Sequence, residues 1–137
     1  MRTRPAVLPG DRPAVEAVLD AARERNGFPP LSEEAEVALT AAVGPVGWLG
    51  DIGGHPVGFV HVRHHRGDTV AEVAAGASPG EVAAVLVPEA VAAAEGPVRV
   101  WATDPAATDA IVAAGGRVTR SLVRLQCSLP AGSPGYD

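Results

Sequence analysis

The stretch from Ala71 to Val87, AEVAAGASPGEVAAVLV, constrains the fold more than any other part of the chain. AEVAA is typical of a strand, GASPG carries turn-forming residues, and VAAVLV is the apolar first half of a helix. A second strand, PVRVWAT, follows this helix at 97–103. A strand, a helix and another strand in this order predict a parallel crossover, so the sheet is expected to contain one parallel pair.

Two helices are expected to precede this unit, after a short extended start at AVL. Asp11 can cap the first helix, and Pro13 lies in its first turn. NGFPPL then opposes regular structure because of its glycine and prolines, and Ser32 caps the second helix. Apolar residues at helical spacing form the expected buried stripe of the first helix: Val15, Val18, Leu19 and Ala22.

The remaining segments are expected to be mostly strands. VGWLGDI and PVGFVHVRH, joined by GGH, predict a hairpin, and a turn at Gly67 leads into TVAEVAA. The apolar helix runs to about Glu95. Asp104 caps the next helix, which Gly115 ends, and a final strand is expected over 117–129. The buried stripe expected for that helix is Ala107, Ala110, Ile111 and Ala114.

This order of elements predicts an α+β fold of three-layer-like construction. We expect one domain over residues 1–130, with a mainly antiparallel sheet flanked by about four helices. Residues 131–137, AGSPGYD, are expected to be a flexible tail. A chain of 137 residues is long enough to bury one sizeable core, and no second domain is needed.

Charge and cysteine content exclude several classes of function. The net charge of −5 argues against nucleic-acid or anionic-membrane binding and favours a small molecule or a protein partner. All 11 basic residues are Arg, a bias typical of GC-rich, actinobacterial genes. One cysteine cannot form an internal disulfide, and no signal-like segment opens the chain, so a cytoplasmic location is expected. No apolar run is long enough to span a membrane.

Four segments carry a resemblance to a known family: NGFPPLSEEAEVAL, GGHPVGFVHV, AEVAA and PVRVWATDPAATDAIVAAGGRVTRSLVRLQ. In these segments the chain resembles the GNAT N-acetyltransferases, and most of all the divergent N-terminal repeat of mycothiol synthases. The resemblance covers nearly the whole chain and implies a V-shaped sheet, splayed between the strand ending near Ala75 and the strand starting near Val98. Acetyl-CoA would lie in this splay and donate its acetyl group to an amine, without a metal.

The family binds the CoA pyrophosphate with an Arg/Gln-x-x-Gly-x-Gly/Ala loop, and this loop is degenerate here. The matching interval reads GASPGE, which is shorter, has no basic residue and lacks the Gly-x-Gly pair. Ser78-Pro79-Gly80-Glu81 instead matches a capping box, in which the Ser78 and Glu81 side chains satisfy the first helical N–H groups. Glu81 also places negative charge where phosphate would bind. The resemblance nevertheless assigns cofactor contacts to Ala74, Ala75, Gly76, Ala77, Ser78, Gly80, Glu81, Val82 and Trp101.

Catalytic candidates are few. In the family, an acid/base residue on the middle strands deprotonates the amine, and Glu72 is the candidate for that general base. A tyrosine often protonates the departing thiolate, but Tyr136, the only tyrosine, is out of register. Cys127 could donate a proton, although its apolar alternation favours a buried structural thiol.

HVRHHR at 61–66 is the most polar stretch. Period two places His61, Arg63 and His65 on one strand face and His64 on the other. A metal site would need further ligands such as Asp68 or Glu72. A substrate or partner surface is a second alternative, and a solvated strand end is the third. We predict no metal. Core packing is expected for three aromatic residues, Trp48, Phe59 and Trp101.

The sequence therefore favours an acetyltransferase-like pseudoenzyme with a degenerate acetyl-CoA site, acting as a binding or assembly module. A homodimer or another subunit is the expected partner. One alternative is an active acetyl-CoA-dependent N-acetyltransferase that acts on a small amine through Glu72. Another alternative is a ligand-binding module in small-molecule biosynthesis.

Overall fold

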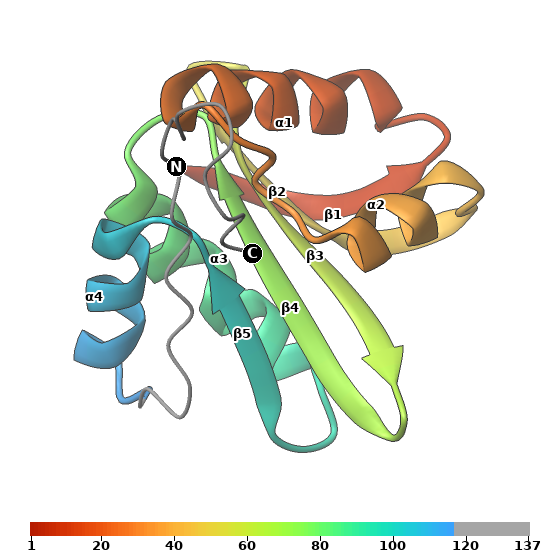
Figure 1. The fold of residues 1–137 in the computed structure, drawn as a ribbon, viewed down its shortest axis with the longest axis vertical. Coiled ribbons are helices and arrows are strands. Elements are labelled where there is room, and N and C mark those ends of the chain that lie inside the picture. Colours follow the sequence, from red (N-terminus) through yellow and green to blue (C-terminus); the bar gives the residue numbers. More distant parts are fainter. Residues whose placement is uncertain (117–137) are drawn as a thin grey trace, which may run out of the picture.

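The computed structural model describes residues 1–116 of the chain, which form a single α+β unit. Figure 1 shows a twisted sheet with helices on both of its faces. In chain order the elements are β1 (Arg2–Leu8), α1 (Arg12–Asn26), α2 (Glu33–Thr40), β2 (Gly44–Ile52), β3 (His55–His65), β4 (Asp68–Ala75), α3 (Pro79–Ala93), β5 (Val98–Ala102) and α4 (Pro105–Ala113).

The described sheet has the strand order β1-β2-β3-β4-β5. Strands β1 to β4 pair antiparallel with their neighbours, and β4 pairs parallel with β5 across α3. This arrangement confirms the predicted mainly antiparallel sheet and its parallel crossover. It also confirms the hairpin: Ile52 pairs with His55 around Gly53 and Gly54, both of which have positive φ angles.

Each face of the sheet has its own apolar core. On one face, α1 and α2 cover side chains that include the fully buried Leu49 and Phe59. On the other face, α3 and α4 cover a second cluster that includes Val60 and Leu86. Alternation along the strands produces this division, because neighbouring residues such as Phe59 and Val60 point to opposite faces. Because helices cover both faces of the sheet, β4 is buried along its whole length except at its first residue, Asp68.

Several local predictions are confirmed. Val15, Val18 and Ala22 form the buried stripe of α1, while Leu19 is only partly buried. The Ser32 side chain accepts a hydrogen bond from Ala35 N–H at the start of α2. The predicted end of α4 is confirmed, because the helix ends at Ala113 and Gly115, with a φ of +105°, follows the C-cap residue Ala114.

Other local predictions were wrong. Asp11 stands at the N-cap of α1, but its carboxylate accepts from Val7 N–H and Arg4 instead of from the helix. In α4 only Ala107 is buried, and Ala114 is exposed.

The predicted strand at 117–129 and tail at 131–137, together with Cys127 and Tyr136, lie outside the described residues. Among residues 1–116, no helix is both long and apolar enough to cross a membrane.

Gly58 provides a test of how closely α3 packs on the sheet. A Cβ atom at Gly58 would lie 2.5 Å from Cγ1 of Val82 and 3.2 Å from Cδ1 of Leu86, so Gly58→Ala forces α3 away from β3. We expect a loss of about 2 kcal/mol in the free energy of unfolding, measured by urea denaturation. Gly96→Ala is the control, because no atom of residues 1–116 lies within 4 Å of its Cβ position. Equal stability of the two variants would contradict the described packing.

Candidate functional site

Glu72 lies in a row of side chains that crosses three strands. It pairs with His61 on β3 and with Trp101 on β5, and paired residues of adjacent strands point to the same face. This is the face that α1 and α2 cover. Glu72 and His61 are 4% and 3% exposed, whereas Trp101 is 39% exposed, so the expected core packing of Trp101 was wrong.

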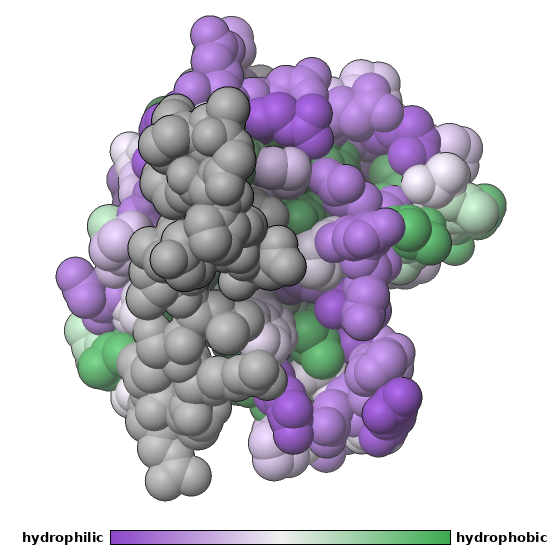
Figure 2. Space-filling model, in the orientation of Figure 1, coloured by the Kyte–Doolittle hydropathy of each residue, from purple (hydrophilic) through white to green (hydrophobic). Residues whose placement is uncertain are grey.

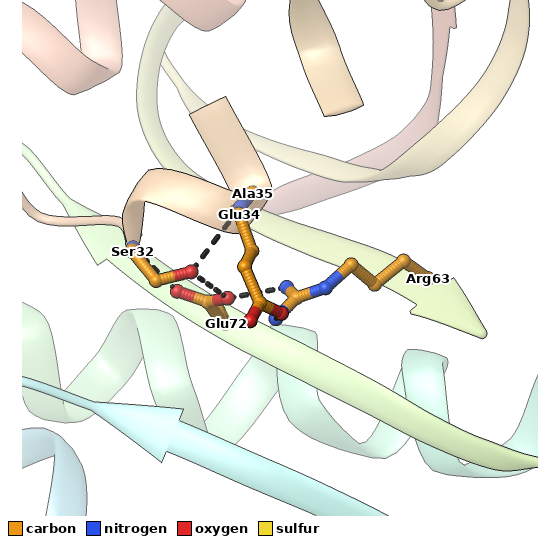
Figure 3. Close-up of polar contacts among 5 residues, drawn as sticks. All are labelled: Ser32, Glu34, Ala35, Arg63 and Glu72. Carbon is orange, nitrogen blue, oxygen red and sulfur yellow. Dashed lines mark hydrogen bonds and ion pairs between the residues drawn. The ribbon is translucent and has the colours of Figure 1, made fainter. Parts of the chain in front are cut away.

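Ser32 holds the Glu72 carboxylate with two hydrogen bonds. Ser32 N–H donates to Oε1 and the Ser32 hydroxyl donates to Oε2, both at 2.7 Å. The same hydroxyl oxygen accepts from Ala35 N–H at 3.2 Å, so Ser32 caps α2 and anchors it to β4 at once (Figure 3). The carboxylate therefore lies at the positive N-terminal end of α2, where the helix dipole favours a negative charge.

Arg63 completes the surroundings of Glu72. Its guanidinium lies between Glu72 and Glu34 (Figure 3). Nη1 donates to Glu72 Oε2, and Nη2 lies 3.6 Å from Oε2 of Glu34. Burial alone would raise the pKa of Glu72, but the hydrogen bonds from Ser32 and Arg63 outweigh burial and lower it. Glu72 is consequently an ionised carboxylate that already has donors on both oxygens. A general base needs a pKa near the working pH, and these donors move the Glu72 pKa the other way.

His61 is a buried neutral imidazole. Burial, aided by the positive charge of Arg63, lowers its pKa from 6.5 to about 4, although the charge of Glu72 opposes this shift. Its Nδ1 atom has no hydrogen-bond partner within the described part of the chain. The alternative of a solvated strand end was therefore wrong for His61, while His64 and His65 are exposed. In residues 1–116, no group of three or more His, Cys, Asp or Glu residues is placed to hold a metal ion.

The turn between β4 and α3 differs from the predicted capping box. Ser78 has a φ of +47° and a ψ of +59°, the left-handed conformation, and its side chain makes no cap hydrogen bond. A residue with this backbone cannot direct its hydroxyl as an extended N-cap residue does, so the capping-box prediction was wrong. Glu81 is exposed in the first turn of α3, and this turn contains no basic residue.

The residues to which the resemblance assigns cofactor contacts differ in their burial. Ala74, Ala75 and Val82 are buried in the two cores, whereas Ala77 and Ser78 are exposed at the turn. Gly76 is half-buried, and a Cβ there would lie 3.0 Å from that of Ala21 on α1. The end of β4 is thus packed closely beneath α1.

Sequence reasoning missed Arg25, which reaches this turn from the last turn of α1. Its Nη2 donates to the carbonyl oxygen of Ala75 at 2.9 Å, and its Nη1 donates to Oδ2 of Asp104 at 2.8 Å. The other oxygen of Asp104 accepts from Ala106 N–H at 3.0 Å, which confirms the predicted cap of α4. Helical spacing places Arg25 on the helix surface, but no local pattern identifies partners 50 and 79 residues away.

Comparison with known proteins defines the fold and not the family. No family model matches the chain, and no curated protein matches it. Among solved structures, the chain is similar to crystal structures of TTHA1254 from Thermus thermophilus. A mutant form has a TM-score of 0.52 and 19% identity over 95% of this chain and 99% of that chain. The wild type has a TM-score of 0.51 and 21% identity over 98% and 100%.

Replacement of Glu72 tests whether it anchors α2. Glu72→Gln leaves Arg63 without its buried partner, so we expect a loss of about 3 kcal/mol in the free energy of unfolding. Glu33→Gln is the matched control, because Glu33 is an exposed acid in the first turn of α2, and we expect a change within about 0.5 kcal/mol. Urea denaturation measures both. Similar stabilities would show that the Ser32–Glu72–Arg63 cluster contributes little.

The low pKa of His61 predicts a pH-dependent stability. Between pH 6.5 and about 4 the unfolded state binds a proton that buried His61 does not, so stability falls as pH falls through this window. The expected loss is at most about 3 kcal/mol. His61→Phe removes this loss, whereas His65→Phe, at an exposed position, keeps it. The pKa of Glu72 is lowered from its ordinary value of 4.5. The stability that its ionised form contributes is therefore lost only as the pH falls below 4.5, outside most of the His61 window. A His61→Phe protein with the wild-type pH profile would contradict this assignment.

Proposed function

We propose that the chain is a non-catalytic, acetyltransferase-like module that binds or assembles with another protein. The state of Glu72 carries this proposal. Glu72 is the general-base candidate on the middle strands, but Ser32 and Arg63 already donate hydrogen bonds to its two oxygens. With a lowered pKa, it is better suited to anchor α2 than to accept a proton from an amine.

The start of α3 supports the same proposal. A pyrophosphate bound at a helix N-terminus is favoured by positive charge, and the first turn of α3 contains Glu81 and no basic residue. The cation that does reach this region, Arg25, is engaged by Ala75 and Asp104.

One observation favours a second candidate, a working N-acetyltransferase. Because the Ser78 side chain makes no cap hydrogen bond, it does not occupy the first N–H groups of α3. In addition, pairing of β4 with β5 stops at Val73 and Ala102, although β4 continues to Ala75. Such an ending is compatible with the splayed sheet that the GNAT resemblance implies, into which acetyl-CoA would fit.

The α2 end of the molecule supports a role in assembly. Val37 on α2 and Val43 before β2 are 66% and 84% exposed, and Figure 2 shows apolar colour at this end of a largely hydrophilic face. A second copy of the chain or a separate subunit would cover these side chains. Light scattering on the wild type and on a Val37→Glu variant measures whether this surface forms a homodimer.

Calorimetry with acetyl-CoA tests the proposed function. We expect no heat of binding and no thermal shift at millimolar acetyl-CoA, because residues 1–116 place no free cation at the start of α3. A functional site occupied at 100 times its dissociation constant would stabilise the fold by about 2.7 kcal/mol. Micromolar binding would overturn the non-catalytic proposal in favour of the acetyltransferase.

A charge reversal then tests the role of Glu81. Glu81→Arg places a cation at the start of α3, and we expect it to gain weak acetyl-CoA binding. Glu95→Arg is the control, since Glu95 is exposed beyond the far end of the same helix. Equal binding by the two variants would show that net charge, and not the position of Glu81, controls affinity.

A further inference from the structure

The pairing of the parallel strands β4 and β5 ends where the two segments diverge. Strand pairing runs from Thr69 and Val98 to Val73 and Ala102. Beyond these residues, β4 leads through Ala75 toward α3, and β5 leads through Asp104 into α4. The crevice outside the carboxyl ends of parallel strands is a general position for ligands in open sheets. Figure 1 shows the end of α1 on the same side as these strand ends.

The guanidinium of Arg25 connects the segments that follow β4 and β5. One of its nitrogens donates to Ala75 O at 2.9 Å and another donates to Asp104 Oδ2 at 2.8 Å. The fixed planar fork of an arginine suits two acceptors held side by side. Since α4 is capped by the second oxygen of Asp104, this carboxylate is held in place from both sides.

We propose that Ala75 and Asp104 form a guanidinium-binding site that Arg25 of the same chain fills, and that Arg25 is a displaceable latch on the ends of β4 and β5. The Arg25 side chain is 32% exposed, so water reaches it and it can leave without opening either core. This inference concerns a different site from Glu72 and does not depend on acetyl-CoA binding.

The chemistry of the vacated site defines what can replace Arg25. Both remaining partners, a backbone carbonyl and a carboxylate, are hydrogen-bond acceptors, and the carboxylate is negatively charged. The replacing group must therefore be a cation with two N–H donors in one plane. A guanidinium compound satisfies this requirement, whereas phosphate and carboxylate ligands are repelled.

Amide hydrogen exchange of an Arg25→Ala variant tests the latch. Two amides report on the two sides of the site. Gly76 N–H donates a hydrogen bond to Val57 O at 2.8 Å, and Ala106 N–H donates one to Asp104. We expect both amides to exchange about tenfold faster, the effect of losing charge-assisted hydrogen bonds. Glu36 N–H in α2 should not change. Arg23→Ala is the matched control, because Arg23 lies in the same helical turn but approaches Glu36 at 3.6 Å.

Chemical rescue tests the identity of the ligand. Millimolar methylguanidinium should restore slow exchange to Arg25→Ala and leave Arg23→Ala unchanged, while inorganic phosphate should have no effect. Asp104→Asn provides a second variant: asparagine still caps α4, but Gly76 should exchange faster because the charge is lost. Wild-type exchange in both Arg25→Ala and Asp104→Asn would overturn the latch. Failure of methylguanidinium to restore exchange, or equal rescue by phosphate, would overturn the guanidinium site.

Discussion

The buried carboxylate of Glu72 is the constraint on which the arrangement of α2 and the middle strands depends. A buried ion costs several kcal/mol unless hydrogen bonds and an opposite charge surround it. Ser32 provides two donors from the start of α2, and Arg63 provides the positive charge from β3. While the carboxylate is buried, the two donors of Ser32 offset the cost of its burial, and they do so only when α2 stays against the sheet. Its solvation requirement therefore fixes the position of that helix.

A similar arrangement occurs at the carboxyl end of the same strand. There the acceptors belong to the sheet and to α4, through Ala75 and Asp104, and the donor is Arg25 of α1. In both places, polar groups that could bind or activate a ligand are already paired within the chain. Pairing of this kind stabilises a fold, but it occupies groups that an active site keeps free for its ligand. This balance is the physical basis for proposing a non-catalytic module.

Local rules predicted those features that depend on neighbouring residues. Ser32 and Asp104 cap their helices as expected, because an N-cap needs only its own side chain and the next few N–H groups. Ser78 has the same chemistry but a left-handed backbone at the turn from β4 into α3. There the chain must also fit beneath α1 and beside α4, since Gly76 packs near Ala21 and Gly80 near Ala106. The path of the crossover decided that backbone conformation.

The sequence by itself determined the α+β class, the mainly antiparallel sheet with its flanking helices and the parallel crossover, because apolar periodicity and turn residues are local properties of the chain. Tertiary structure decided the site. Glu72 meets Ser32 across 40 residues, and Arg25 meets Asp104 across 79. It also decided that His61 is a buried neutral imidazole. Burial and charge pairing depend on which segments meet in space, and no spacing along the sequence encodes those distances.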